Sequence, residues 1–421
     1  MTQAFCDMLY LFSCAVHGRQ PEIAPDRRLD LTAVRKQAVL QGVWPFVFTS
    51  LKHLAESGCL NGWEEQVAAW NQELLLAVMN HARRNAAAAD TIHKLEEEGI
   101  PCCILKGESL ARLYAVPQCR LSGDVDFLIP PELEGKACRL LEREGYELMS
   151  RGSGLPHVEA DHPAAGQIEM HVQLYDGVSA EQWFADGQEI TESFRQYQSD
   201  YGTFQELGPT DGALFVFFHF VKHFLNTGGG IKQLADVLVY FAACGSEIDW
   251  KRVENKLTEA NCVRLFAHMI GVGVCYLGFD ASAFPPADFE PELADRLMED
   301  LYERGGFVRE AEKSGVIFVP YMKRMIERDG TDSEQYLQEK QQENTKSLLF
   351  PRRKTMEKNY PYVMKSPLLL PVAWIHRAVR FAWRRFIRHA SVAEQSAYQA
   401  DSSRKEKQEQ RLALARDLEM L

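Results

Sequence analysis

The sequence lacks C-x-x-C cysteine pairs, long apolar runs and an excess of positive charge, and each absence excludes a class of protein. Its ten cysteines include no C-x-x-C pair, which indicates free thiols of a reducing cytoplasm rather than a disulfide framework or a zinc site. No stretch approaches the roughly 18 apolar residues of a membrane span. The formal net charge of −12 disfavours binding of long nucleic acids, because neutralising phosphates needs a basic surface.

The first residues also lack the positively charged start of a signal peptide. Residues 1–18 instead have the spacing of an amphipathic helix. We therefore expect a cytoplasmic protein. The chain of 421 residues is long enough for two or three domains, and it contains no internal repeat.

The hydrophobic pattern divides the chain into four regions. Residues 1–98 carry helical spacing, whereas residues 99–208 change to short apolar runs bounded by glycine and proline, which are typical of strands. Residues 209–327 return to helical patterns, and residues 328–421 combine a polar linker with a basic helical region. The predicted fold class is α+β, with a small mixed-sheet core flanked by N-terminal and C-terminal helical regions.

Two aspartates stand out in the apolar run DVDFLI. Side chains alternate along a strand, so Asp124 and Asp126 share one face while Val125 and Phe127 point into the core. Two carboxylates this close repel each other unless solvent or a cation neutralises them. A hard divalent ion is the natural bridge, and Mg²⁺ is the usual one where phosphates are bound.

A further carboxylate lies in the run QIEMHVQL, where Glu169 and His171 share a face by the same alternation. If this strand neighbours the Asp-Val-Asp strand, Glu169 completes a three-carboxylate cluster of the kind that holds two Mg²⁺ ions for phosphoryl transfer. The strand could instead be an edge with one solvated face. His171 could contact the substrate, tune Glu169 or form an ordinary hydrogen bond.

Upstream of the aspartates, a turn from a strand into a helix has the features of a phosphate site. Gly107 lies at the turn, and Ser109 and free backbone N–H groups follow in the first helical turn. Lys106, Arg112 and Arg120 are cations within reach. Ser109 could equally cap the helix, and Lys106 and Arg120 could be ordinary surface charges.

The pattern LKG…LY…P…R…DVDFLI…IEMHVQL resembles the nucleotidyltransferase superfamily that includes DNA polymerase β. More closely, it resembles a bacterial group described as uncharacterised nucleotidyltransferase family proteins. The resemblance covers residues 30–240 well and the remainder loosely. It implies an enzyme that uses Mg²⁺, with two ions expected, to move a nucleoside monophosphate from an NTP such as ATP. The acceptor would be a small molecule, a sugar or cell-surface precursor, or a protein side chain.

Carried over residue by residue, the resemblance assigns Gly107 and Ser109 to the phosphates. It assigns Asp124 and Asp126 to the metals, and Glu169 to completing the metal set and helping to activate the nucleophile. Lys106 and Arg120 join the nucleotide side as cations.

Glu108 departs from the superfamily pattern, because the residue after the glycine is usually small. A glutamate there would oppose a triphosphate unless it points away or touches a metal. The spacing from Gly107 to Asp124 is also long for the superfamily. These departures favour the alternative that the fold serves as a non-catalytic nucleotide-binding or scaffold module. The intact set of three carboxylates argues against that alternative.

The resemblance extends to HFVKHF…GGGIKQLADVLVY, where His219, His223 and Asp236 match recurring residues. His219 and His223 share a helix face, a spacing that suits a metal. Because phenylalanines surround them, we expect histidines at a domain interface that line the acceptor cleft. Lys232 and Asp236 also share a face and could form a simple helix ion pair. These four residues, with His171, are the candidates on the substrate side.

One basic segment lies in an otherwise acidic chain. Residues 351–390 hold ten lysines and arginines and a single acid. Within it, residues 371–390 read as a helix with an arginine face and an apolar stripe. Such a helix could lie on an anionic membrane surface, although we favour packing on the acidic body of the same protein. The last thirty residues or so suggest an exposed helix or a frayed tail.

Overall fold

The computed structural model describes residues 1–24, 27–60, 62–149, 157–174, 190, 192–226, 228–304, 321, 324, 369–376 and 406–421. The described residues up to Arg304 belong, with residues 414–420, to one compact unit, and the others to a second unit. The polar stretch 328–350 and residues 377–390 of the basic segment lie outside the described residues. Within the described parts, no helix combines the length and apolar character that crossing a bilayer requires.

Four helices occupy the N-terminal region, as its periodicity predicts: α1 (Gln3–Val16), α2 (Leu31–Leu40), α3 (Trp44–Glu56) and α4 (Glu64–Glu97). Local sequence features explain where two of these helices, α2 and α3, begin. The Asp30 side chain accepts a hydrogen bond from the backbone N–H of Ala33 and so caps α2. Pro45 lies in the first turn of α3, where a missing N–H costs nothing. α3 packs against both α1 and α4.

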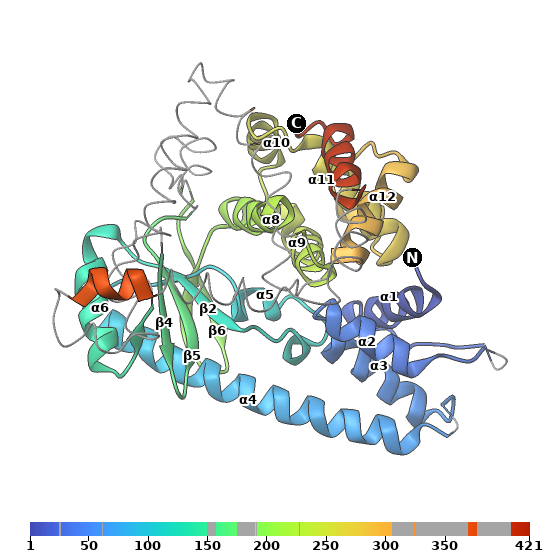
Figure 1. Cartoon of the computed structure of the whole chain (residues 1–421), viewed down its shortest axis with the longest axis horizontal. Coiled ribbons are helices and arrows are strands. Elements are labelled where there is room, and N and C mark those ends of the chain that lie inside the picture. The colour runs from blue at the N-terminus through green and yellow to red at the C-terminus, as the bar shows by residue number, and fades with distance from the viewer. Residues whose placement is uncertain are drawn as a thin grey trace. The chain divides into compact units, whose positions relative to one another are not determined.

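The middle of the chain forms one mixed sheet with the strand order β3-β4-β5-β2-β1-β7-β6 (Figure 1). Its strands are β1 (Cys103–Ile104), β2 (Asp124–Leu128), β3 (Glu147–Leu148), β4 (His157–His162), β5 (Gly166–His171), β6 (Arg195–Ser199) and β7 (Gly202–Glu206). β2 pairs antiparallel with β1 and parallel with β5. The predicted neighbourhood of the Asp-Val-Asp strand and the Glu-x-His strand is therefore confirmed.

The hairpin of β6 and β7 was not predicted from the sequence. Tyr197 and Phe204 face each other across it, and both are buried in the core of the sheet. Gly202 begins β7 with a φ of +131°, a backbone conformation that favours glycine. Alternating aromatic and polar residues on either side of this glycine are the signal that indicates a hairpin.

The core of the unit lies between one face of the sheet and two helices, α4 and α6 (Glu134–Arg143) (Figure 1). Phe127 of β2 and Ile168 and Met170 of β5 are at most 1% exposed there. They pack with Ile92 of α4 and Leu141 of α6. The alternation of side chains then places the carboxylates of β2 and β5 on the opposite face.

The remaining helices follow the sheet in sequence: α8 (Pro209–Asn226), α9 (Ile231–Cys244), α10 (Trp250–Glu259), α11 (Val263–Tyr276) and α12 (Pro291–Arg304). α8 is buried along most of its length and packs against α9. The expectation of an exposed or frayed C-terminal end was wrong for residues 414–420. Leu414 and Leu418 are buried, and Asp417 forms an ion pair of 2.6 Å with Arg296 of α12.

Candidate functional site

The parallel pairing of β2 and β5 brings two of the predicted carboxylates together. Asp126 lies directly opposite Glu169 in the strand register. One ligand atom each from Asp126, Glu169 and His171 lies within 4.8 Å of the others, and no other such group occurs in the described part of the chain. His171 Nε2 lies 3.2 Å from Asp126 Oδ1. Asp126 is 1% exposed, so the group is closed to solvent on at least one side.

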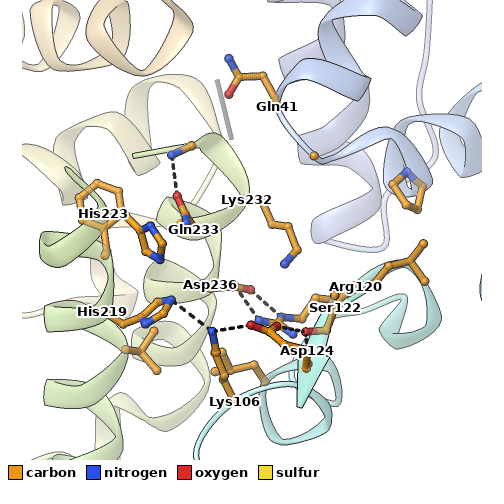
Figure 2. A pocket seen from close by; sticks show the side chains of 18 of the residues that line it. Gln41, Lys106, Arg120, Ser122, Asp124, His219, His223, Lys232, Gln233 and Asp236 are labelled. Atoms are coloured by element: carbon orange, nitrogen blue, oxygen red, sulfur yellow. Dashed lines mark hydrogen bonds and ion pairs between the residues drawn. The ribbon is translucent and has the colours of Figure 1, made fainter. Parts of the chain in front are cut away.

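Lys106 lies between the two aspartates of β2. Its Nζ is 3.2 Å from Asp126 Oδ2 and 3.5 Å from Asp124 Oδ2, and it also lies 3.5 Å from His219 Nε2 (Figure 2). Ser122 holds Asp124 from the other side, since its hydroxyl donates to Asp124 Oδ1 over 3.1 Å. Lys106 is therefore an internal partner of the aspartates and not an ordinary surface charge.

The environment of this cluster shifts the pKa values of Asp126 and Glu169 in opposite directions. Burial favours the neutral form of Asp126, but the charge of Lys106 and the hydrogen bond with His171 outweigh it and lower the pKa to about 2. Burial and the neighbouring Asp126 charge raise the pKa of Glu169 to about 7. Although burial opposes it, the charges of Asp126 and Asp124 raise the pKa of Lys106. One lysine is thus shared by two aspartates, and Glu169 forms no ion pair with a lysine or arginine of the described residues.

The chemistry of this donor set fits a divalent cation. His171 Nδ1 is buried and finds no hydrogen-bond partner among the described residues, and the buried Asp126 Oδ2 has only its contact of 3.2 Å with Lys106. Two carboxylates and an imidazole are ligands that Mg²⁺ or Mn²⁺ accepts, with water completing the shell. Asp124 lies beside this group rather than in it, paired with Lys106.

The turn before α5 (Glu108–Ala111) has the backbone that only glycine adopts readily. Gly107 has a φ of +89° and caps the helix, so Ser109 is not the cap. Ser109 is buried and does not line the neighbouring cavity. Glu108 lies toward α4, where it accepts a hydrogen bond of 3.4 Å from Asn85 and borders a small hollow with Tyr201. The glutamate that departs from the superfamily pattern therefore does not face the carboxylates.

Arg120 lines the cavity beside Asp124, as expected, but its guanidinium is already engaged by other groups. It is 2% exposed, and its Nε and Nη2 donate to the two oxygens of Asp236 over 2.7 and 2.8 Å. Its Nη1 donates to the carbonyl of Gly107 over 3.1 Å, and the Tyr114 hydroxyl also donates to Asp236. The simple pair of Lys232 with Asp236 does not form, because Arg120 binds both oxygens. Arg120 thereby ties α9 to the glycine turn.

A cavity of about 450 Å³ opens beside Asp124 (Figure 2). Lys106, His219, His223 and Lys232 line it, in agreement with the expected cleft. Burial, together with the charge of Lys106, lowers the pKa of His219, and the same causes lower that of His223 to about 4. Burial and the charge of Arg120 lower the pKa of Lys232 to about 8. At neutral pH the two histidines are therefore uncharged and Lys232 is largely charged.

Residues of the N-terminal region complete the cavity wall. Gln41, Trp44 and Pro45 line it together with the helices α8 and α9. The Gln41 side chain accepts a hydrogen bond from the N–H of Ile231 and so helps to cap α9. These residues were missed, because nothing in the local sequence relates the turn between α2 and α3 to the sheet.

A central Asp-x-Asp strand, a parallel neighbour with a third carboxylate, and a cavity at their mouth define a protein of the nucleotidyltransferase class. A family model described as "Uncharacterised nucleotidyltransferase" matches residues 28–278, and the chain belongs to that family. The predicted resemblance is thus confirmed, and the match extends beyond residue 240.

Among solved structures, the chain is similar to an antigenic nucleotidyltransferase-like protein from Paracoccidioides brasiliensis, at 16% identity and a TM-score of 0.28. That similarity covers 38% of this chain and 76% of the other. No curated protein matches the sequence.

Proposed function

We propose that the protein is a Mg²⁺-dependent nucleotidyltransferase that moves an NMP group from an NTP to an acceptor hydroxyl or phosphate. The observation that carries this proposal is the group of Asp126, Glu169 and His171, whose ligand atoms lie within 4.8 Å of one another beside a cavity. A cavity of about 450 Å³ is of the size that binds small molecules. This favours a small molecule, a sugar or a single protein side chain as the acceptor.

The residues divide into roles. Asp126, Glu169 and His171, with Asp124 beside them, would hold the two Mg²⁺ ions expected from the superfamily. Bound Mg²⁺ would neutralise the negative charge of the triphosphate and of the departing pyrophosphate. Gly107 and the helical turn that follows it would offer backbone N–H groups to the phosphates.

The chemical step is a displacement at the α-phosphorus. The acceptor oxygen forms a bond to this phosphorus, the bond to the bridging oxygen of the β-phosphate breaks, and pyrophosphate leaves. The proton of the acceptor would pass to Glu169, the third carboxylate of the cluster, which lies opposite Asp126 in the neighbouring strand. Lys232, His219 and His223 would contact the acceptor from the helical wall of the cavity.

One observation favours a second function, a non-catalytic nucleotide-binding or scaffold module on the same fold. Lys106 already pairs with both Asp124 and Asp126 without a metal ion, which is what a site that no longer binds metal would need. Glu108 no longer supports this alternative, because it does not line the cavity. We retain two predictions from the sequence: a cytoplasmic location from the cysteine pattern, and the absence of long nucleic-acid partners from the acidic composition. Membrane contact through residues 371–390 stays the less favoured possibility.

Transfer of a labelled nucleotide tests the proposal. The protein is incubated with each NTP labelled at the α-phosphorus, Mg²⁺ and a fraction of small molecules and proteins, and labelled products are separated. We expect a product with natural protein that disappears with Asp126→Asn and persists with Asp161→Asn, an exposed aspartate of β4. Binding of a Mg²⁺–NTP complex without any labelled product would favour the scaffold function.

A further inference from the structure

The position of Lys106 has a consequence for the number of metal ions. Its ammonium contacts one oxygen of Asp126 at 3.2 Å and one of Asp124 at 3.5 Å. The side chain is 13% exposed and Asp126 is 1% exposed, so solvent screens these contacts little. This is the position between the two aspartates at which a bridging divalent ion would be bound.

The local chain path places Lys106 there. β1 ends at Ile104, and the N–H of Leu105 still donates to the carbonyl of Asp126 over 2.9 Å. The chain then bends at Lys106 and turns at Gly107, whose φ is +89°. The bend breaks the alternation of the strand and directs the lysine to the carboxylate face. Of the described cations, Lys106 alone forms ion pairs with both aspartates.

Among the residues that the structure describes, no other lysine or arginine forms an ion pair with Asp124 or Asp126. Arg120 is paired with Asp236. His219 contacts Lys106 itself and belongs to the mostly apolar helix α8. Lys232 lines the same cavity but forms no ion pair with either aspartate (Figure 2). An ammonium and a divalent ion bind the same oxygens and repel each other, so they exclude one another from this position.

We propose that Lys106 occupies, in the nucleotide-free protein, the place of one of the two divalent ions. The free protein then binds a single ion, at Asp126, Glu169 and His171. A second ion enters between Asp124 and Asp126 only when the ammonium leaves. Lys106 has a flexible stem and the cavity beside it, so it can move toward the phosphates of a bound nucleotide. The inference rests on the proposed metal-dependent function.

Counting bound Mn²⁺ by electron paramagnetic resonance, with the full chain and without nucleotide, tests this inference. The natural protein should bind one ion. Lys106→Met, which keeps the length of the side chain without its charge, should bind two, and the first should bind at least about tenfold more tightly because a repelling charge is gone. Lys232→Met is the matched control, because it removes a charge from the same cavity and should leave one bound ion.

A double variant locates the additional ion and guards against misfolding. Lys106→Met leaves buried carboxylates without a counter-ion, so its fold is checked by circular dichroism. Lys106→Met combined with Asp124→Asn removes one negative charge as well, and it should return to a single, tightly bound ion. If the double variant keeps two ions, the second site does not include Asp124 and the inference fails.

Two further outcomes overturn the inference in distinguishable ways. One bound ion in both the natural protein and Lys106→Met, with equal affinity, removes the role of Lys106 but leaves the metal site and the proposed function standing. No Mn²⁺ binding in the natural protein or in any variant removes the metal site itself, and the proposed function fails with it.

Discussion

Two groups of residues hold buried charge in opposite ways: the helical wall of the cavity, with Asp236 and Arg120, and the strand wall beside the cavity, with Asp126, Glu169 and His171 of β2 and β5. On the helical wall, Asp236 receives hydrogen bonds from Arg120 and Tyr114, and every nitrogen of the Arg120 guanidinium donates to a described partner. On the strand wall, His171 Nδ1 has no hydrogen-bond partner within the described residues, and Asp126 Oδ2 has only its contact of 3.2 Å with Lys106. A complete network stabilises a fold, whereas an incomplete one is retained where a ligand completes it. The difference separates the structural wall from the functional wall.

The largest expected effect comes from breaking the complete network. Arg120→Met leaves the buried carboxylate of Asp236 without its main partner, and we expect a loss of about 3–5 kcal/mol in the free energy of unfolding, measured in urea. Arg139→Met, at an exposed arginine of α6, should change it by less than about 0.5 kcal/mol. Equal losses in both variants would show that Arg120 does not hold the helical wall.

Removing a charge from the strand wall should increase the free energy of unfolding, whereas removing Arg120 from the helical wall should decrease it. The raised folded-state pKa of Glu169, about 7 against 4.5, means that the folded protein releases this proton at a higher pH than the unfolded chain. Without metal, stability should therefore fall as the pH rises from about 4.5 to 7. Glu169→Gln removes this penalty, and we expect the variant to be more stable than the natural protein at pH 8 by up to about 3 kcal/mol.

Thermal and urea unfolding of metal-free protein across this pH range measure the effect. Glu147→Gln, at an exposed glutamate of β3, is the matched control and should keep the pH dependence of the natural protein. A Glu169→Gln variant that is less stable than the natural protein at pH 8 would mean that the strand wall is complete without a ligand.

The glycine turn that joins the two walls gives a smaller effect. Gly107→Ala introduces a side chain at a φ of +89°, where the Cβ meets no neighbour but the backbone is strained, at a cost of about 1–3 kcal/mol. Gly123→Ala is the control, since its Cβ also meets nothing and its φ is not positive. Unfolding in urea should separate the two. A cost shared by both positions would indicate crowding and not backbone strain.

The smallest effect is expected at Glu108, which belongs to neither wall. Glu108→Gln keeps the size of the side chain and its contact with Asn85, so the affinity for Mg²⁺–NTP should change less than twofold. Isothermal titration measures this affinity. A large gain in affinity on removing the charge would place Glu108 beside the triphosphate and revive the scaffold function.

The sequence predicted the strand wall better than the helical wall. Alternation of side chains placed Asp126 and Glu169 on the functional face, and the resemblance to known proteins made their strands neighbours. The role of Lys106 could not be predicted, because a bend ends the strand pattern at that residue. The pair of Arg120 with Asp236 joins residues far apart in the chain, so no local pattern indicates it. The same reason hides Gln41 in the cavity wall.

The overall architecture was predicted to a similar degree. The long helix α4 and the core helix α6 follow from periodicity and from their flanking proline and glycine residues. The hairpin of β6 and β7 was missed although Gly202 and its alternating neighbours indicate it. Tertiary contacts decide the rest, as they do for the burial of residues 414–420.

The central claim is that the strand wall is completed by a metal-bound nucleotide, and thermal unfolding with each NTP, with and without Mg²⁺, tests it most directly. A ligand at a hundred times its dissociation constant adds about 2.7 kcal/mol to the stability of the folded state. We predict that at least one NTP stabilises the natural protein only when Mg²⁺ is present, and that Asp126→Asn abolishes this shift. If no NTP stabilises the natural protein at millimolar concentration, or if Asp126→Asn shifts equally, the account is contradicted.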